Sequence, residues 1–569
     1  MKADLTRDTF YPFKHFTRVL MQQGRVQLDA DLNEQVSILL HYLRTLAADL
    51  IGPAGGPDDT AFQISPITPP ITNDFRIGQG RCYVDGILCE AESVPVKVIV
   101  LSTPPIPGVV QVDSWCLDGA ELQDAAYSPQ QGAAYLELFD DVAGTNPPRT
   151  PAFPATLVNI TNFDRINGKI TIANLPNISA PANPKLRRIF TYLRQPNFIY
   201  SNQANNLVPP PLPGPAVSLQ VYLDVWERVI TYIEDSSIRE VALGGPDTAV
   251  RTQLVWQVKT TPALDETCMS PAQLATLFQW ENRGKLKARA KQSSVSPDPC
   301  IISPSARYQG PENHLYRVEI NRRGPAWDGA ESSKGTAATF KWSRENGSVA
   351  FGIAGGGGTN RIILETLGRD DRFGLSEGDW VEIQDDNSVL LIKPATLLQV
   401  HAIDPSSMAV TLDGTPDPTV GGNLALHPLL RRWDLQAGDP AEGGLTLGSD
   451  NAALVIEGTW LELEDGVQIL FQPASPVQPV PQDAITHIYR TGDYWLIPAR
   501  TATGDVEWPR LTTAAGNLEV DTSGNSIPIA LPPHGVNHHY APLAVVGIDP
   551  AVGVSPKKDC RAVSNAGHG

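Results

Sequence analysis

The sequence predicts a mainly β chain, built from several small antiparallel β-sandwich or β-barrel modules in tandem and preceded by one N-terminal α-helix. Three observations support this. Glycine and proline (47 and 50 of 569 residues) make up roughly one residue in six, short alternating apolar runs lie between them, and only two segments have helical spacing. The chain is also too long for a single core, so several domains are expected.

The first expected element is a helix that begins at Asp31 and ends at Gly52-Pro53. Asp31 is placed to cap the first backbone N–H groups, and Glu34 follows at capping-box spacing. Five apolar residues then recur in alternating steps of three and four and form one stripe, which is the candidate docking or oligomerisation site: Val36, Leu39, Leu43, Leu46 and Leu50. Such a stripe is buried either on the body of its own chain or against copies of itself.

Strands are expected next along the chain. Residues 81–89 form a hairpin with Asp85-Gly86 at the turn. Further strands are expected at 221–228, 315–320 and 338–344, and a second, shorter helix at 271–280. Residues 378–386 and 458–466 share a Trp-led pattern that ends in an acidic turn before a second apolar strand. This similarity is either a weak internal repeat or the ordinary reuse of good hairpin sequences.

Three proline-rich stretches, at 102–108, 208–215 and 472–481, are expected to act as extended joints. They suggest a division of the chain into five parts: an N-terminal segment with the amphipathic helix (1–60), a β domain (61–207), a β domain with a short helical insertion (217–350), a small barrel-like module (351–432) and a C-terminal β domain (433–569).

Composition excludes several classes of function. A net charge of -18 disfavours binding to a phosphate backbone, so nucleic acid is not an expected partner. No apolar run is long enough to span a membrane, and charged residues at the start replace the apolar core of a signal peptide. Synthesis in the bacterial cytoplasm is therefore expected, with exit by lysis or within a larger particle.

Six scattered cysteines contain no C-x-x-C pair, which supports neither a zinc ribbon nor a redox dithiol. We expect most of them to be small buried apolar residues. The alternative is a disulfide between Cys82 and Cys89 across the predicted hairpin.

The only histidine cluster contains His534, His538 and His539, which are the candidate metal ligands. His534 and His538 are four residues apart, a spacing that brings two side chains to one face only in a helix. The preceding prolines and Gly535 argue against a helix here. A loop whose histidines bond to the backbone or to neighbouring strands is the favoured interpretation. The glycine-rich stretch 355–360 lacks the Gly-Lys-Ser/Thr ending of a phosphate loop and is expected to be a hairpin tip. No cofactor is expected.

Carboxylates are plentiful, and a glycoside hydrolase needs two of them about 5–10 Å apart across a cleft. The candidates are Asp224, Glu227, Glu319, Glu382, Glu462, Glu464, Asp465 and Glu507. Spacing alone pairs none of them, and acidic residues on the solvated faces of strands are the default interpretation. No catalytic residue is therefore assigned. Tryptophans beside carboxylates keep a polysaccharide hydrolase or lyase, or a carbohydrate-binding protein, as alternatives.

The chain resembles an uncharacterised bacterial family described as a domain of unknown function. The resemblance covers nearly the whole chain and runs through these strings: Arg7-Asp8-Thr9-Phe10, residues 21–35, 239–248 and 316–320, Lys341-Trp342-Ser343-Arg344, and residues 463–467, 492–500 and 538–543. Many family members have Trp where Leu32 stands here, a difference that should alter packing only.

The resemblance implies membership of a particle and no defined chemical reaction, because members lie among genes for phage-tail-like contractile injection systems. We therefore expect a structural component of such a particle: a tail appendage (fibre or spike) or a baseplate-associated protein, with no enzymatic activity. The expected partners are other tail or baseplate proteins, a surface glycan, and further copies of this chain, a trimer being one arrangement. The protein would become extracellular as part of a released particle.

Overall fold

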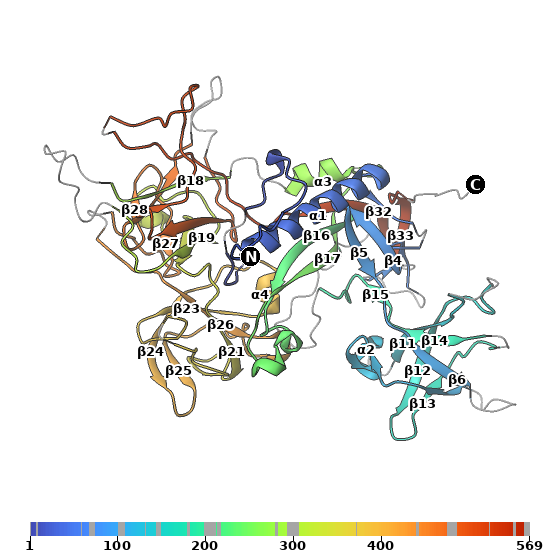
Figure 1. The fold of residues 1–569 in the computed structure, drawn as a ribbon. Helices are drawn as coiled ribbons and strands as arrows, with labels where there is room; N and C mark the ends of the chain where they lie inside the picture. Colours follow the sequence, from blue (N-terminus) through green and yellow to red (C-terminus); the bar gives the residue numbers. More distant parts are fainter. Residues whose placement is uncertain are drawn as a thin grey trace. The chain divides into compact units, whose positions relative to one another are not determined.

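The structure is a computed structural model, shown in Figure 1. It describes residues 2–6, 9–57, 60–67, 74–100, 108–130, 133–143, 150–178, 182–197, 212, 218–263, 265–278, 283–292, 307–370, 372–439, 443–474, 486–522, 524–549 and 553–562. Almost all of the three proline-rich joints, and Arg7-Asp8, lie outside the described residues.

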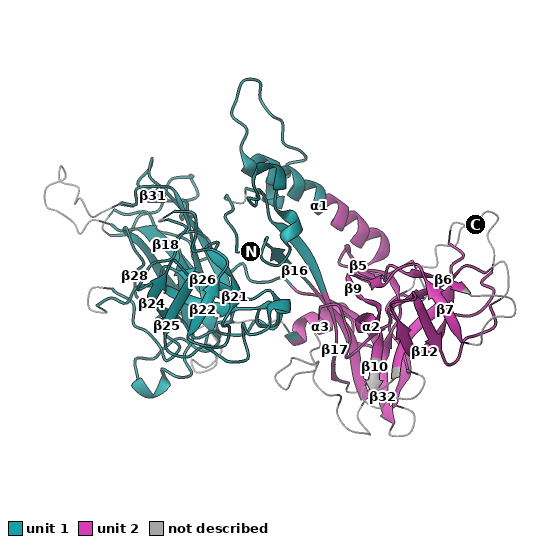
Figure 2. Cartoon of the chain, turned by 90° about the horizontal axis from the view of Figure 1, so that it is seen from below, with its two compact units in different colours: residues 1–40, 226–255, 278–537 teal, residues 41–225, 256–277, 538–569 magenta. Residues whose placement is uncertain are grey.

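The prediction of a mainly β chain with an N-terminal helix is confirmed. The chain divides into two compact units, coloured separately in Figure 2. Unit 1 comprises residues 1–40, 226–255 and 278–537, and unit 2 comprises residues 41–225, 256–277 and 538–569. Each unit is thus assembled from segments that are distant in the sequence. The five consecutive domains expected from the joints stay a prediction.

A sandwich of two antiparallel sheets forms one part of unit 1. The five-stranded sheet has the order β27 (Ala453–Leu454), β20 (Thr339–Ser343), β19 (His314–Arg322), β30 (Tyr494–Arg500) and β31 (Asp505–Val506). The three-stranded sheet has the order β18 (Lys285–Ala290), β29 (Val467–Gln472) and β28 (Leu461–Glu462). Large aromatic side chains from both sheets fill one core, among them Trp342, Trp495 and Phe471.

A closed six-stranded barrel forms the other part of unit 1. Its strands, in order around the barrel, are β21 (Ala350–Gly355), β22 (Arg361–Leu364), β25 (Ala409–Asp413), β24 (Leu398–Asp404), β23 (Trp380–Gln384) and β26 (Leu429–Trp433). Residues 355–360 join β21 to β22, so the predicted hairpin tip is confirmed. Five short 3-10 helices also lie in unit 1: η1 (Pro12–Lys14), η2 (Ser236–Ile238), η3 (Val241–Leu243), η4 (Glu331–Ser333) and η5 (Leu424–Leu426).

One expected strand is wrong. After the Trp380 string the chain forms a short helix, α4 (Asp386–Leu390), instead of a second apolar strand. The reason is a capping box, in which the Asp385 side chain accepts from the Ser388 N–H and the Ser388 hydroxyl accepts from the Asp385 N–H. The similar string at 458–466 does lead into a strand, β29.

Unit 2 contains a seven-stranded sheet with the order β10 (Tyr127–Gln130), β11 (Ala133–Asp140), β12 (Thr156–Asp164), β13 (Lys169–Ile172), β7 (Val109–Val112), β6 (Val96–Val100) and β14 (Pro184–Arg187). Because β14 also pairs with β11, six of these strands form a ring around an aliphatic core. The pair β8 (Cys116–Leu117) and β9 (Ala120–Glu121) leads into the short helix α2 (Leu122–Ala125).

The rest of unit 2 consists of smaller sheets. One has the order β1 (Ala54–Gly55), β4 (Gly80–Val84) and β5 (Ile87–Ala91), and another the order β15 (Phe190–Thr191), β3 (Arg76–Ile77) and β2 (Ile64–Ser65). A four-stranded sheet has the order β17 (Arg251–Pro262), β16 (Ser218–Ile230), β32 (His539–Asp549) and β33 (Gly553–Asp559), with residues 226–230 and 251–255 of the first two strands belonging to unit 1. The predicted hairpin is β4–β5, and the predicted second helix is α3 (Pro271–Phe278).

The long helix α1 (Asp29–Ile51) begins two residues earlier than predicted, so the assignment of Asp31 as its cap is wrong. Asp29 and Asp31 lie inside the first turn, where the helix dipole stabilises negative charge. Glu34 does not complete a capping box, and its carboxylate accepts a hydrogen bond from the Thr9 hydroxyl at 2.5 Å. The predicted end is confirmed, because Gly52 follows the helix with φ of 94°.

A disulfide joins Cys268, in the segment after β17, to Cys560, just after β33. The predicted alternative pair, Cys82 and Cys89, lie opposite each other in the β4–β5 register, yet both are free and buried. Cys116 is free and exposed. Sequence spacing did not indicate the bonded pair because its cysteines are 292 residues apart.

This disulfide predicts a redox-dependent stability. Replacing Cys268 and Cys560 by Ser should lower the free energy of unfolding of the chain by about 2–4 kcal/mol, because a cross-link between distant residues restricts the unfolded chain. Thermal unfolding followed by circular dichroism measures this loss, and Cys116→Ser is the matched control. Equal stability of the double variant and the wild type, or alkylation of Cys268 and Cys560 without reductant, would contradict the prediction.

Candidate docking helix and buried charge cluster

Helix α1 has two faces of different character. All five residues of the predicted stripe are exposed, from 48% for Val36 to 78% for Leu50. The opposite face contacts the chain itself: Ala30 and Ile38 are buried, and a Cβ at Gly86 would lie 1.9 Å from the Arg44 carbonyl oxygen. The turn of the β4–β5 hairpin therefore packs directly on the helix backbone. The helix is held by one face and leaves its apolar stripe open.

The stripe has the spacing of a coiled-coil seam and is longer than predicted. Leu32, which is 62% exposed, precedes Val36 by four residues and continues the pattern. The seam, Leu32 to Leu50, spans 19 residues, or about 27 Å along the helix axis. Leu40 and Tyr42 are also exposed beside it and widen the apolar surface. The step of four before Val36 is the sequence signal that identifies Leu32.

The chain before α1 exposes further apolar side chains. Tyr11, Phe13, Phe16, Leu20, Met21, Val26 and Leu28 are all more than half exposed. This lead is fastened to the helix by the Thr9–Glu34 hydrogen bond and by one from the Val19 N–H to Gln35 Oε1 at 2.8 Å. Residues 11–50 contain 15 of the 31 exposed large apolar side chains found in the described part of the chain. So dense an exposed apolar surface is typical of an interaction site.

Two of the candidate carboxylates, Glu319 on β19 and Glu382 on β23, come together in unit 1 in a cluster of buried charges. Lys341 on β20 lies between them, donating to Glu382 Oε2 and lying 3.8 Å from Glu319 Oε1. Arg317 donates to Glu319 Oε2 at 2.6 Å. The Lys2 ammonium completes the cluster, 2.8 Å from Glu319 Oε1 and 4.0 Å from Glu382 Oε1.

Charge and burial act against each other in this cluster. Burial alone would raise the pKa of Glu319, but the cations Lys2, Arg317 and Lys341 hold it well below its usual range. Burial outweighs the facing carboxylates at Lys2 and lowers its pKa to about 8, so its ammonium is still protonated at neutral pH. Glu319 is therefore ionised and paired, and Glu382 is held by Lys341, which suits a structural cluster better than proton transfer.

Glu464 lies in a second cluster, where it accepts hydrogen bonds from Arg344 at 2.6 Å and from the Tyr316 hydroxyl at 3.1 Å. Burial is the main cause that raises the pKa of Glu464 to about 7, against the opposing effect of Arg344. Asp434 accepts from the Arg344 N–H at 2.9 Å. This group is the nearest approach to an acid poised at neutral pH among the predicted carboxylates.

Of the other candidate carboxylates, Asp465 adjoins Glu464 and its charge contributes to the raised pKa of Glu464, whereas the rest have partners elsewhere. Asp224 accepts from Lys259 at 2.6 Å, Glu462 pairs with Lys291, and Glu507 pairs with Arg500. Asp465 lies in the turn before β29 with a positive φ of 46°. Glu227 lies in β16.

The three candidate histidines do not share one set of ligands. His538 Nδ1 lies 2.7 Å from Asp224 Oδ1, and His539 Nδ1 lies 2.8 Å from Asp85 Oδ2. The His534 ring packs on Tyr494 at 5.4 Å between centroids. Within the described ranges, no group of three or more His, Cys, Asp or Glu side chains is placed to hold a metal ion. His534 and His538 contact residues of β30 and β16, and His539 lies in β32 and contacts Asp85 in the turn between β4 and β5.

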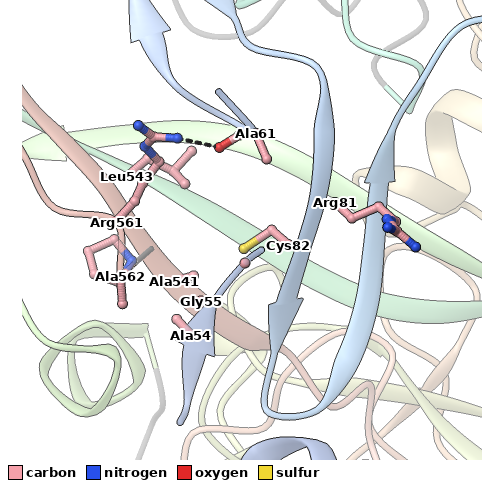
Figure 3. A pocket seen from close by; sticks show the side chains of 11 residues that line it. Ala54, Gly55, Ala61, Arg81, Cys82, Ala541, Leu543, Arg561 and Ala562 are labelled. Atoms are coloured by element: carbon pink, nitrogen blue, oxygen red, sulfur yellow. Dashed lines mark hydrogen bonds between the residues drawn. The ribbon is translucent and has the colours of Figure 1, made fainter. Parts of the chain in front are cut away.

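A pocket in unit 2 is lined by β1, β4, β32 and Arg561 (Figure 3). Its enclosed space holds about one water molecule, which is too small for a substrate. Arg561 closes one side by donating to the Ala61 carbonyl at 2.6 Å. The Cys82 thiol lines the opposite side, and burial raises its pKa to about 11, so it is not a reactive thiolate.

Glu464 gives a pH prediction. Its folded pKa of about 7 lies above its unfolded value, so its contribution to stability is complete below about pH 4.5 and is lost as the pH rises through 7. Glu464→Gln should reduce the stability difference between pH 5 and pH 8 by about 1–3 kcal/mol. Thermal unfolding at both pH values tests this, with Glu462→Gln as the control. An unchanged difference in Glu464→Gln would contradict it.

Within the described residues, no helix is both long and apolar enough to cross a membrane. No curated protein and no solved structure matches the chain. One family model of unknown function, DUF6519, matches residues 1–113, 215–275 and 260–567, which is most of both units. The match includes α1 and the buried charge cluster, and on this extent the chain belongs to the DUF6519 family.

Proposed function

We propose that the chain is a non-catalytic structural component of a phage-tail-like contractile injection particle, either a tail appendage such as a fibre or spike or a baseplate-associated protein. In this role it assembles through the exposed seam of α1. The seam is the observation that carries the proposal, because six large apolar side chains at heptad spacing are unfavourable in water. The proposal that the assembly is an injection particle rests on the family resemblance.

The occupant of the seam is a second copy of α1, or two further copies in a trimer. A heptad seam is complementary to itself, since each side chain fits between four side chains of an identical helix. The flanking positions favour this pairing, because Asn33, Gln35, Leu40, Tyr42 and Ala47 are uncharged and only Asp49 adds a charge. The strong net charge of the chain therefore does not oppose close approach along the seam.

The disulfide supports a destination outside the reducing cytoplasm. Such bonds persist in oxidising surroundings and are rare in cytosolic proteins. Cys268–Cys560 thus fits a protein that is made in the cytoplasm and works in a released particle. Other tail or baseplate proteins and a surface glycan are the further partners of this role.

The alternative, a polysaccharide-degrading or carbohydrate-binding appendage, requires carboxylates or aromatic side chains in an open cleft. Glu319 and Glu382 are the carboxylates that the fold brings together, but both are buried and paired with lysines. This favours the structural role.

The test of the seam is a pair of charge substitutions. Leu43→Glu with Leu46→Glu should lower the self-association constant at least about tenfold, since both charges would be buried in the helix interface. Sedimentation velocity of the purified chain measures the mass, and copurification with particles measures incorporation. Both side chains are already exposed, so the fold of one copy should be retained.

Thr45→Glu, on the same exposed stretch of α1 but outside the seam, is the matched control and should leave both readouts unchanged. A wild-type chain that sediments as a monomer of 61.5 kDa, or a double variant that associates and incorporates like the wild type, would refute assembly through α1.

A further inference from the structure

Lys2 occupies a recess whose walls come from the sandwich and the barrel of unit 1. Its ammonium faces Glu319 and Glu382 and lies 5.5 Å from the centre of the Trp433 ring. A Cβ at Gly347 would lie 3.6 Å from Cγ of Lys2 and 3.5 Å from the Trp433 ring, so the lysine stem lies beside Gly347 and near the edge of that ring.

The carboxylate oxygens are divided between resident cations and Lys2. Arg317 and Lys341 occupy the Oε2 atoms of Glu319 and Glu382, respectively. The Oε1 atoms face the Lys2 ammonium, and Glu382 Oε1 is buried without a hydrogen-bond donor among the described residues. Two carboxylate groups and an aromatic face are the features that recognise a primary ammonium group.

Lys2 differs from the rest of the cluster because it comes from the N-terminal arm, residues 2–28. The Lys2 side chain is 22% exposed, whereas those of Glu319, Glu382 and Lys341 are at most 5% exposed. Ala3 is buried beside it, with its carbonyl accepting from the Asn346 side chain at 2.9 Å. Lys341 and Arg431 oppose a further positive charge at the position of Lys2. The walls of the recess thus come from the two β modules, and the group that fills it comes from the N-terminal arm.

We propose that Glu319, Glu382, Trp433 and Gly347 form a binding site for a lysine side chain, filled in this structure by Lys2, which latches the N-terminal arm to unit 1. The site recognises the primary ammonium group and its alkyl stem. This inference rests on the recess alone and does not depend on assembly through α1.

Removal of the ligand and its chemical replacement test the site. In the full chain, Lys2→Ala should lower the midpoint of thermal unfolding by about 1–3 °C at pH 7. It should also speed chymotrypsin cleavage at Tyr11, Phe13 and Phe16 in the released arm. n-Propylammonium chloride replaces the missing atoms and should restore the midpoint in a saturable manner. n-Propanol and sodium chloride at equal concentration should not restore it.

Lys14→Ala, an exposed lysine of the same arm, is the matched control and should behave as the wild type. In the wild type, n-propylammonium competes with Lys2 and should speed cleavage of the arm, a readout that needs no variant. A wild-type midpoint and cleavage rate in Lys2→Ala would overturn the proposal. Restoration by n-propanol as effective as that by n-propylammonium would overturn it as well.

Discussion

The ion pair between Lys341 and Glu382 is the interaction on which unit 1 depends. Lys341 belongs to the sandwich and Glu382 to the barrel, and both side chains are almost completely buried. Removing one partner would leave the other as a buried charge without its hydrogen-bonded counter-charge, a loss of up to about 3–5 kcal/mol. Strand β26 reinforces this link, because Leu430 lies in the barrel core while Trp433 lies in the sandwich core. The two β modules therefore share structure and do not simply follow one another along the chain.

Elements governed by local chemistry could be predicted from the sequence. Asp85-Gly86 gave the β4–β5 turn because both residues accept positive φ, and the alternation at 315–320 gave β19. Where two local signals competed, the prediction failed. The string after Trp380 has an apolar run, but Asp385 and Ser388 cap a helix there, and this satisfies backbone N–H groups that a strand would have to pair elsewhere.

Of the two candidate sites, one depends on a local sequence pattern and the other on contacts between distant residues. The seam of α1 is visible in the sequence because heptad spacing is local, although exposure of the seam depends on which face the β4–β5 hairpin covers. The charge cluster was not predictable, because Lys2, Glu319, Lys341 and Glu382 are brought together only by the fold. The candidate carboxylates were named individually, but nothing in their spacing indicated which of them would meet.

The pairing of β16 with β32 has a consequence for synthesis on the ribosome. Ser218 pairs with Gly547, about 330 residues later, and β32 separates β16 from β33 in the sheet. At about 5–20 residues per second, β16 waits roughly 15–70 seconds for its neighbour to be translated. During that interval one edge of β16 has no partner strand, which is a hazard for misassembly between nascent chains. Chaperone binding to this nascent edge would limit that hazard.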